Sequence, residues 1–147
     1  MQISQAGIDL IKSFESLRLE AYLCPAGVWT IGWGHTAGVL PGDRTDEAGA
    51  EEFLQSDIAT VEAALPKVIR VPLSQGQWDA LTSLGFNLAG GPAAFPHVAP
   101  KMTAFLNAGN FAAAADEMLD IDRDIKGHVL PGLARRRQAE RALFLSA

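Results

Sequence analysis

The stretch that decides the fold is ESLRLEAYLCPAGVWTIGWGHT, residues 15–36. Two short runs with the composition of strands, Arg18–Cys24 and Val28–Gly34, flank the turn-forming segment Pro25-Ala26-Gly27. Glycines in and after the second run indicate a backbone that bends or lets another group approach closely. These glycines are Gly32, Gly34 and Gly38. The pattern predicts one small antiparallel hairpin near the N-terminus.

The rest of the chain carries the sequence signals of helices. Their expected spans are Ser4 to about Phe14, Thr45 to Leu65, Ser74 to Leu88, Lys101 to Asn107, Asn110 to about Ile121, and Pro131 to Leu145. Ser4, Thr45 and Asn110 are the expected N-caps, and Ser74-Gln75-Gly76-Gln77 is typical of a capping box. We expect Pro66 to end the long second helix, and later prolines to make the stretch before Lys101 irregular.

Helices around one small hairpin make a mostly helical α+β fold. The chain of 147 residues has the length of one domain, 1–147. We expect a hairpin lobe over about 15–44, a linking helix over about 46–65, and a larger helical lobe over about 72–147 that includes the N-terminal helix. Two lobes imply a cleft, where ligand sites tend to lie.

Composition excludes several classes of function. The net charge of −5 argues against a dedicated nucleic-acid binder, which would carry a basic face. The single cysteine, Cys24, excludes an internal disulfide and a Cys-rich zinc site, and we expect no metal or other cofactor. Charges interrupt the opening residues MQISQAGIDLIKSFES, and no stretch is long enough to span a membrane. We therefore expect no signal peptide and synthesis in a reducing cytosol.

Charge is unevenly distributed along the chain. Residues 1–124 hold 7 Lys and Arg against 16 Asp and Glu, whereas residues 125–147 hold five cations against Glu140 alone. The five cations are Lys126, Arg135, Arg136, Arg137 and Arg141. One interpretation is a solvated helix that closes an acidic body. The other is a basic patch on the last helix that meets an anionic surface.

Glu15 is the first candidate for chemistry. It continues the apolar stripe of Ile8 and Ile11 and lies at the C-terminal end of the predicted helix. Burial and the negative end of a helix both disfavour a carboxylate, so this residue is suited to act as a general acid. The alternative is a glutamate that turns to solvent where the helix frays.

Cys24 and Thr30 are the second and third candidates. They lie symmetrically about Gly27, so in a hairpin centred there they should face each other on one side of the sheet. Gly32 should lie on the same side and leave room for an open, polar pocket facing Glu15. The alternatives are a small buried cysteine and an ordinary strand threonine.

With the spacing Glu15-x8-Cys24-x5-Thr30, followed by IGWGHT, the chain resembles the phage lysozyme (endolysin) family, glycoside hydrolase family 24. Three further stretches resemble family motifs in the same order, so that the resemblance covers about four fifths of the chain. They are QWDALTSLGFN (77–87), LNAGNFAAAADEM (106–118) and LPGLARRRQAERALF (130–144). Residues 95–105 and 121–124 depart from the family pattern.

The resemblance implies a lysozyme-like, two-lobed fold and cleavage of the β-1,4 bond between N-acetylmuramic acid and N-acetylglucosamine in peptidoglycan. Glu15 would protonate the leaving oxygen, and Thr30 would hold the attacking water, which gives inversion. Cys24 stands where the family usually has aspartate; as a thiolate it would stabilise positive charge at the sugar carbon, and as a thiol it would bond weakly to a water.

The resemblance also implies supporting residues. His35 is expected to form an ion pair with Asp57 of the long helix, and Arg136 to lie beside Glu15. Expected substrate contacts are Thr36, Phe86 and Asn87.

The partner implied by the resemblance is peptidoglycan. The protein would be a monomer that waits in the host cytoplasm until a holin opens the inner membrane and then acts in the periplasm. Two other classes stay open. One is a Cys-His peptidoglycan peptidase that uses Cys24 with His35 or His97; the other is a wall-binding module whose catalysis has lapsed.

Overall fold

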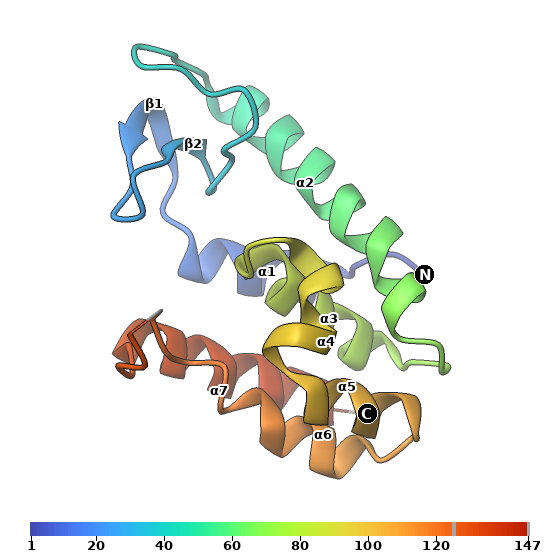
Figure 1. Ribbon diagram of the computed structural model, residues 1–147. Helices are drawn as coiled ribbons and strands as arrows, with labels where there is room; N and C mark the ends of the chain where they lie inside the picture. The colour runs from blue at the N-terminus through green and yellow to red at the C-terminus, as the bar shows by residue number, and fades with distance from the viewer. Residues whose placement is uncertain (125, 147) are drawn as a thin grey trace. The chain divides into compact units, whose positions relative to one another are not determined.

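The computed structural model describes residues 1–124 and 126–146, which form a mostly helical α+β fold as predicted. Figure 1 shows the elements in chain order by colour. They are α1 (Gln5–Phe14), β1 (Arg18–Leu23), β2 (Trp29–Gly32), α2 (Glu47–Val68), α3 (Gln75–Asn87), the 3-10 helix η1 (Gly91–Ala94), α4 (Phe95–Val98), α5 (Pro100–Asn107), α6 (Phe111–Met118) and α7 (Pro131–Leu145).

The chain divides into two compact units. Unit 1 comprises Met1–Leu10 and Val61–Ala147, and unit 2 comprises Ile11–Thr60. The divisions fall within α1 and α2, whereas the predicted lobe boundaries lie near residues 15, 44 and 72.

Unit 2 contains the predicted hairpin, but its register differs from the prediction. Thr30 pairs with Tyr22, and the Cys24 N–H donates to the Val28 carbonyl at 3.0 Å. The expected Cys24–Thr30 cross-strand pair is therefore wrong. The reason is the turn: the hairpin is centred on Ala26, and Gly27 takes the left-handed φ of +78° as the last residue of a three-residue loop.

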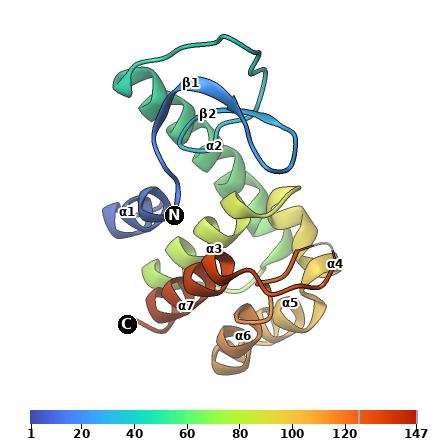
Figure 2. The same ribbon diagram turned by 90° about the vertical axis from the view of Figure 1, so that its left-hand side faces the viewer.

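The expected open space above Gly32 is also absent from unit 2. A Cβ at this position would lie 3.4 Å from the Ala50 Cβ, because β2 packs closely on the first part of α2. Figure 2 shows the hairpin alongside that part of α2. The buried aliphatic side chains of this unit are Ile11, Ile31, Ala50, Leu54 and Ile58.

Unit 1 is built around α3, which lies beside α7 in both views (Figures 1 and 2). The predicted capping box opens α3: Ser74 Oγ accepts from the Gln77 N–H, and Gln77 Oε1 accepts from the Ser74 N–H. Trp78, Leu81 and Leu84 are buried on α3. They belong to a cluster of buried apolar side chains, whose other large members include Leu65, Phe95, Met102, Leu106, Met118 and Phe144.

Proline positions account for most of the differences in helix boundaries. Pro66 does not end α2, since the helix continues to Val68. Pro92, Pro96 and Pro100 stand in the first turns of η1, α4 and α5, where a missing N–H costs no hydrogen bond. The stretch expected to be irregular is therefore mostly short helices.

Two helix ends also differ from the prediction. Asp46, not Thr45, caps α2, because its carboxylate accepts from the Gly49 N–H at 2.7 Å. Asn110 caps α6 as predicted, but this helix ends at Met118 rather than near Ile121.

Candidate active site

Glu15 follows the end of α1, with its N–H bonded to the Ile11 carbonyl at 3.0 Å. Its half-buried side chain lies against the backbone of Gly34: a Cβ there would stand 2.9 Å from Glu15 Oε2. Gly34 also has φ +77°, which side chains rarely adopt. Position 34 is therefore occupied by glycine for two reasons, and the sequence alone did not distinguish it from its glycine neighbours.

The turn that carries Gly34 is held from two directions. Ile31 and His35 exchange two backbone hydrogen bonds of 2.9 Å across it. The Lys12 ammonium lies 4.3 Å from the centre of the Trp33 ring and bonds to Glu51 at 2.7 Å, which lowers the pKa of Glu51. The backbone beside the Glu15 carboxylate is thus fixed in place.

Cys24 lies at the tip of the hairpin, among hydrogen-bond donors. The backbone of Val28 first, and then that of Ala26, lower the pKa of the Cys24 thiol, while desolvation opposes them. Cys24 and Thr30 meet at Val28 although they stand on different rungs of the hairpin, because the Cys24 N–H and the Thr30 hydroxyl both donate to the Val28 carbonyl. The thiolate is favoured relative to an ordinary cysteine.

Thr30 is only 4% exposed, and its hydroxyl donates to the Val28 carbonyl at 3.0 Å. A threonine hydroxyl has a single hydrogen, so in this arrangement the oxygen can only accept further hydrogen bonds. A water that donates to Thr30 Oγ1 keeps its lone pairs free for attack on carbon.

His35 and Asp57 make the expected contact. Nδ1 of the buried His35 lies 2.8 Å and 3.1 Å from the two carboxylate oxygens of Asp57. The imidazole also stacks on Phe53, with ring centres 4.3 Å apart and planes 1° from parallel. Phe53 is not among the predicted site residues, although it lies one helical turn before Asp57 and so on the same face of α2.

Breaking the His35–Asp57 pair should destabilise the protein by about 1–4 kcal/mol, because each partner would be left partly buried without the other. Chemical unfolding of His35→Ala, Asp57→Ala and the double variant measures the coupling. Activity per folded molecule should persist in all three. Independent, additive losses would show that the contact contributes nothing.

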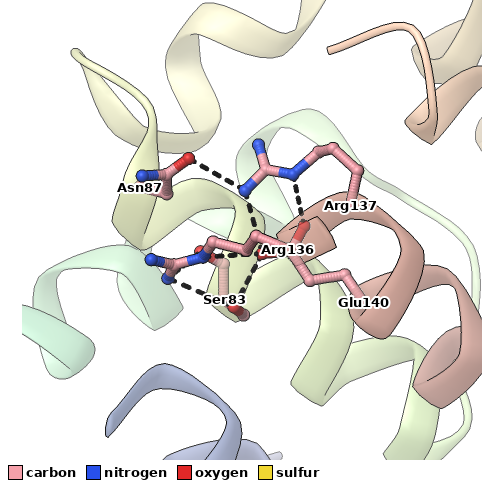
Figure 3. Close-up of polar contacts among 5 residues, drawn as sticks. All are labelled: Ser83, Asn87, Arg136, Arg137 and Glu140. Carbon is pink, nitrogen blue, oxygen red and sulfur yellow. Dashed lines mark hydrogen bonds and ion pairs between the residues drawn. The ribbon is translucent and has the colours of Figure 1, made fainter. Parts of the chain in front are cut away.

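A polar network between α3 and α7 contains Arg136 (Figure 3). Glu140 is fully buried and accepts from Arg136 Nε at 3.1 Å, Arg137 Nη2 at 3.0 Å and Ser83 Oγ at 2.7 Å. Arg137 Nε lies 2.7 Å from the second Glu140 oxygen, and Arg137 Nη2 also donates to Asn87 Oδ1 at 2.8 Å. Arg136 is therefore buried with Glu140 and Ser83; its expected contact with Glu15 stays a prediction.

Burial makes this network interdependent. Burial raises the pKa of Glu140 and lowers the pKa of Arg137, and in each case the opposite charge of the partner counteracts it. Each buried charge is therefore compensated by the other, and removing either group would leave a buried charge unpaired.

The basic patch considered for residues 125–147 is smaller than that interpretation required, because two of its five cations are buried, while Lys126 and Arg135 are exposed. Arg136 and Arg137 are 3% and 0% exposed, and Arg141 bonds to Asp116 at 2.7 Å. Residues 125 and 147, the ends of that segment, lie outside the described part of the chain. The missed signal was spacing, because Arg136 and Arg137 stand four and three residues before Glu140 on one helix.

The remaining predicted residues lie at two places. Thr36 is exposed and directly follows His35, while Phe86 and Asn87 are half-buried at the C-terminal end of α3. The described residues include no group of three or more His, Cys, Asp or Glu placed to hold a metal ion. Within 1–124 and 126–146, every helix is too short or too polar to cross a membrane.

Comparisons with known proteins agree on one family. The family described as Phage lysozyme matches residues 12–140. The endolysin of Acyrthosiphon pisum secondary endosymbiont phage 1 is 46% identical over 150 residues, and the alignment covers 100% of both chains. The endolysin of Salmonella phage P22 is 42% identical over 156 residues and 99% of each chain. The solved muramidase domain of SpmX from Asticaccaulis excentricus is similar with a TM-score of 0.88 at 38% identity, covering 99% of each chain.

Proposed function

The chain belongs to the phage lysozyme family and is a glycoside hydrolase of the lysozyme type, and from this premise we propose that it cleaves the β-1,4 bond between N-acetylmuramic acid and N-acetylglucosamine in peptidoglycan. The observation that carries the proposal is the placement of Glu15 against Gly34, in the turn that directly follows the strand bearing Thr30. Glycoside hydrolysis with inversion needs a proton donor for the leaving oxygen and a group that acts on the attacking water from the opposite face, and Glu15 and Thr30 would take these two places.

In this mechanism Glu15 donates a proton to the leaving glycosidic oxygen. The attacking water donates to Thr30 Oγ1, whose own hydrogen is bonded to the Val28 carbonyl, so the water is oriented with a lone pair toward the sugar carbon. Attack on the face opposite the leaving group gives inversion; the proton that the water loses passes to solvent, and Glu15 regains a proton from solvent after the product leaves. The Cys24 thiolate stabilises the positive charge that develops on the sugar ring.

The Cys24 role predicts a difference between two substitutions. Cys24→Asp should remain active because it keeps a negative charge, whereas Cys24→Ser should lose roughly tenfold or more in kcat because its hydroxyl stays neutral. In the wild type, kcat should rise with pH as the Cys24 thiol loses its proton, over a range below the ordinary thiol pKa of about 8.5. This rise should vanish in Cys24→Asp. Turbidity loss of permeabilised Gram-negative cells across pH measures it. An inactive aspartate variant beside a fully active serine variant contradicts the charge-stabilising role.

Product analysis tests the proposed bond. Digestion of purified peptidoglycan should release new reducing ends without new free amino groups, and the anomer formed first, followed by NMR, should be the inverted one. New amino groups would instead indicate the Cys-His peptidase. Binding to the wall with neither product would indicate a lapsed wall-binding module.

We also propose that this lysozyme serves host-cell lysis, acting as a monomer on the cell wall after a holin releases it from the cytoplasm. The endolysins named among its relatives support this role. Culture turbidity after expression with and without a holin tests the dependence on release.

A further inference from the structure

Arg137 bonds to Asn87, and we propose that Arg137 is a positioning residue that fixes the Asn87 amide so that its nitrogen donates to a carbonyl or hydroxyl oxygen of the saccharide. The inference rests on the proposed function, because it assigns a task to a residue expected to contact the glycan. The proposal makes Arg137 of α7 a determinant of saccharide specificity. Arg137 and the α3 residue that it contacts both belong to unit 1.

The orientation of the Asn87 amide follows from donor chemistry. A guanidinium only donates, so the Asn87 atom 2.8 Å from Arg137 Nη2 is the amide oxygen. Figure 3 shows that oxygen turned toward Arg137 and the nitrogen on the opposite side. Asn87 is half-buried, and among the described residues no acceptor bonds to its Nδ2. The side chain therefore presents two hydrogen-bond donors in a fixed direction.

The guanidinium that fixes the amide is itself immobilised. Arg137 is 0% exposed and contacts both Glu140 oxygens, through Nε at 2.7 Å and Nη2 at 3.0 Å. Arg136 and Ser83 hold the same carboxylate from the other side. Nη2 is shared between Glu140 and Asn87, so the position of the carboxylate determines where the asparagine oxygen is held.

Stability alone is a weak reason for such a network. Apolar side chains of similar volume would usually stabilise the contact between α3 and α7 at least as well as buried ion pairs do. An apolar replacement could not hold an amide at the half-exposed end of α3. Two directed N–H donors on a neutral group suit the acetamido carbonyls and hydroxyls of peptidoglycan glycan strands.

A double-mutant cycle of Arg137→Lys and Asn87→Ala tests the proposal on soluble, uncross-linked peptidoglycan oligosaccharides. Asn87→Ala should raise KM about tenfold, the worth of one or two hydrogen bonds, with kcat within about twofold. Arg137→Lys should raise KM similarly, because an ammonium cannot reproduce the fork that reaches both Glu140 and Asn87. It should add nothing further to KM in the Asn87→Ala background.

Asn87→Asp keeps the acceptor for Arg137 and removes the donors, so KM should rise about tenfold without loss of Tm. A matched control is Asn107→Asp at the end of α5, where Oδ1 accepts from the Arg70 N–H and Nδ2 donates to the Val68 carbonyl. That variant should lower Tm and leave KM unchanged.

If the wild type cleaves normally, either of two results overturns the positioning role. One is that Arg137→Lys raises KM by the same factor in the wild-type background and in the Asn87→Ala background. The other is an unchanged KM in Asn87→Asp. This variant keeps Arg137, so we expect it to fold, and its KM can be measured even if Arg137→Lys fails to fold. Absence of new reducing ends from wild type would instead remove the proposed function, and this inference with it.

Discussion

Glu15→Gln should lower the rate of cell lysis at least about a hundredfold while the protein folds as wild type does, because general acid catalysis contributes about 10²–10⁴. Glutamine keeps the size of the side chain, so it can occupy the same space beside Gly34, but it has no acidic proton to give to the leaving oxygen. Turbidity loss of permeabilised cells gives the rate, and thermal unfolding shows that Tm is retained.

Glu20→Gln in β1 is the matched control, since Glu20 lies in the same unit, is exposed, and approaches Arg44 only at 3.6 Å. It should lyse cells at nearly the wild-type rate. A Glu15→Gln protein with activity close to wild type would exclude Glu15 as the acid, whatever the reaction products are.

Local sequence signals predicted local structure well. The capping box at Ser74–Gln77 and the Asn110 cap are confirmed because each depends on hydrogen bonds within a few residues. The predictions at proline are wrong because the effect of a proline is not local. The sequence predicts that Pro96 and Pro100 interrupt helical structure, but the effect of a proline depends on whether it falls in a first turn, which is decided by where neighbouring segments pack.

The candidate site shows the same limit at the level of side chains. The spacing Glu15-x8-Cys24-x5-Thr30 located the candidate residues, but the hairpin register differs, because a one-residue shift in the turn centre is not visible in composition. The run Arg135–Arg137 suggested a solvated face. In the structure a single carboxylate, Glu140, makes it possible to bury two of these arginines, and burial is a tertiary property that charge counting cannot reveal.

Glu140→Ala should destabilise the protein by about 3–5 kcal/mol, because it leaves the buried guanidiniums of Arg136 and Arg137 without a counter-ion. Denaturant unfolding monitored by circular dichroism measures the loss. Glu52→Ala on α2 is the control: this glutamate is exposed, so its removal should change stability by no more than about 0.5 kcal/mol.

Replacing the whole network separates its contribution to stability from its contribution to function. A variant carrying Arg136→Met, Arg137→Met and Glu140→Leu removes all three buried charges together, so its stability should return to within about 2 kcal/mol of wild type. Lysis should stay impaired, because nothing then holds the Asn87 amide that Arg137 fixes at 2.8 Å. If Glu140→Ala were as stable as wild type, the ion pairs would not be coupled. If the triple variant regained full lysis with its stability, the charges between α3 and α7 would serve packing alone.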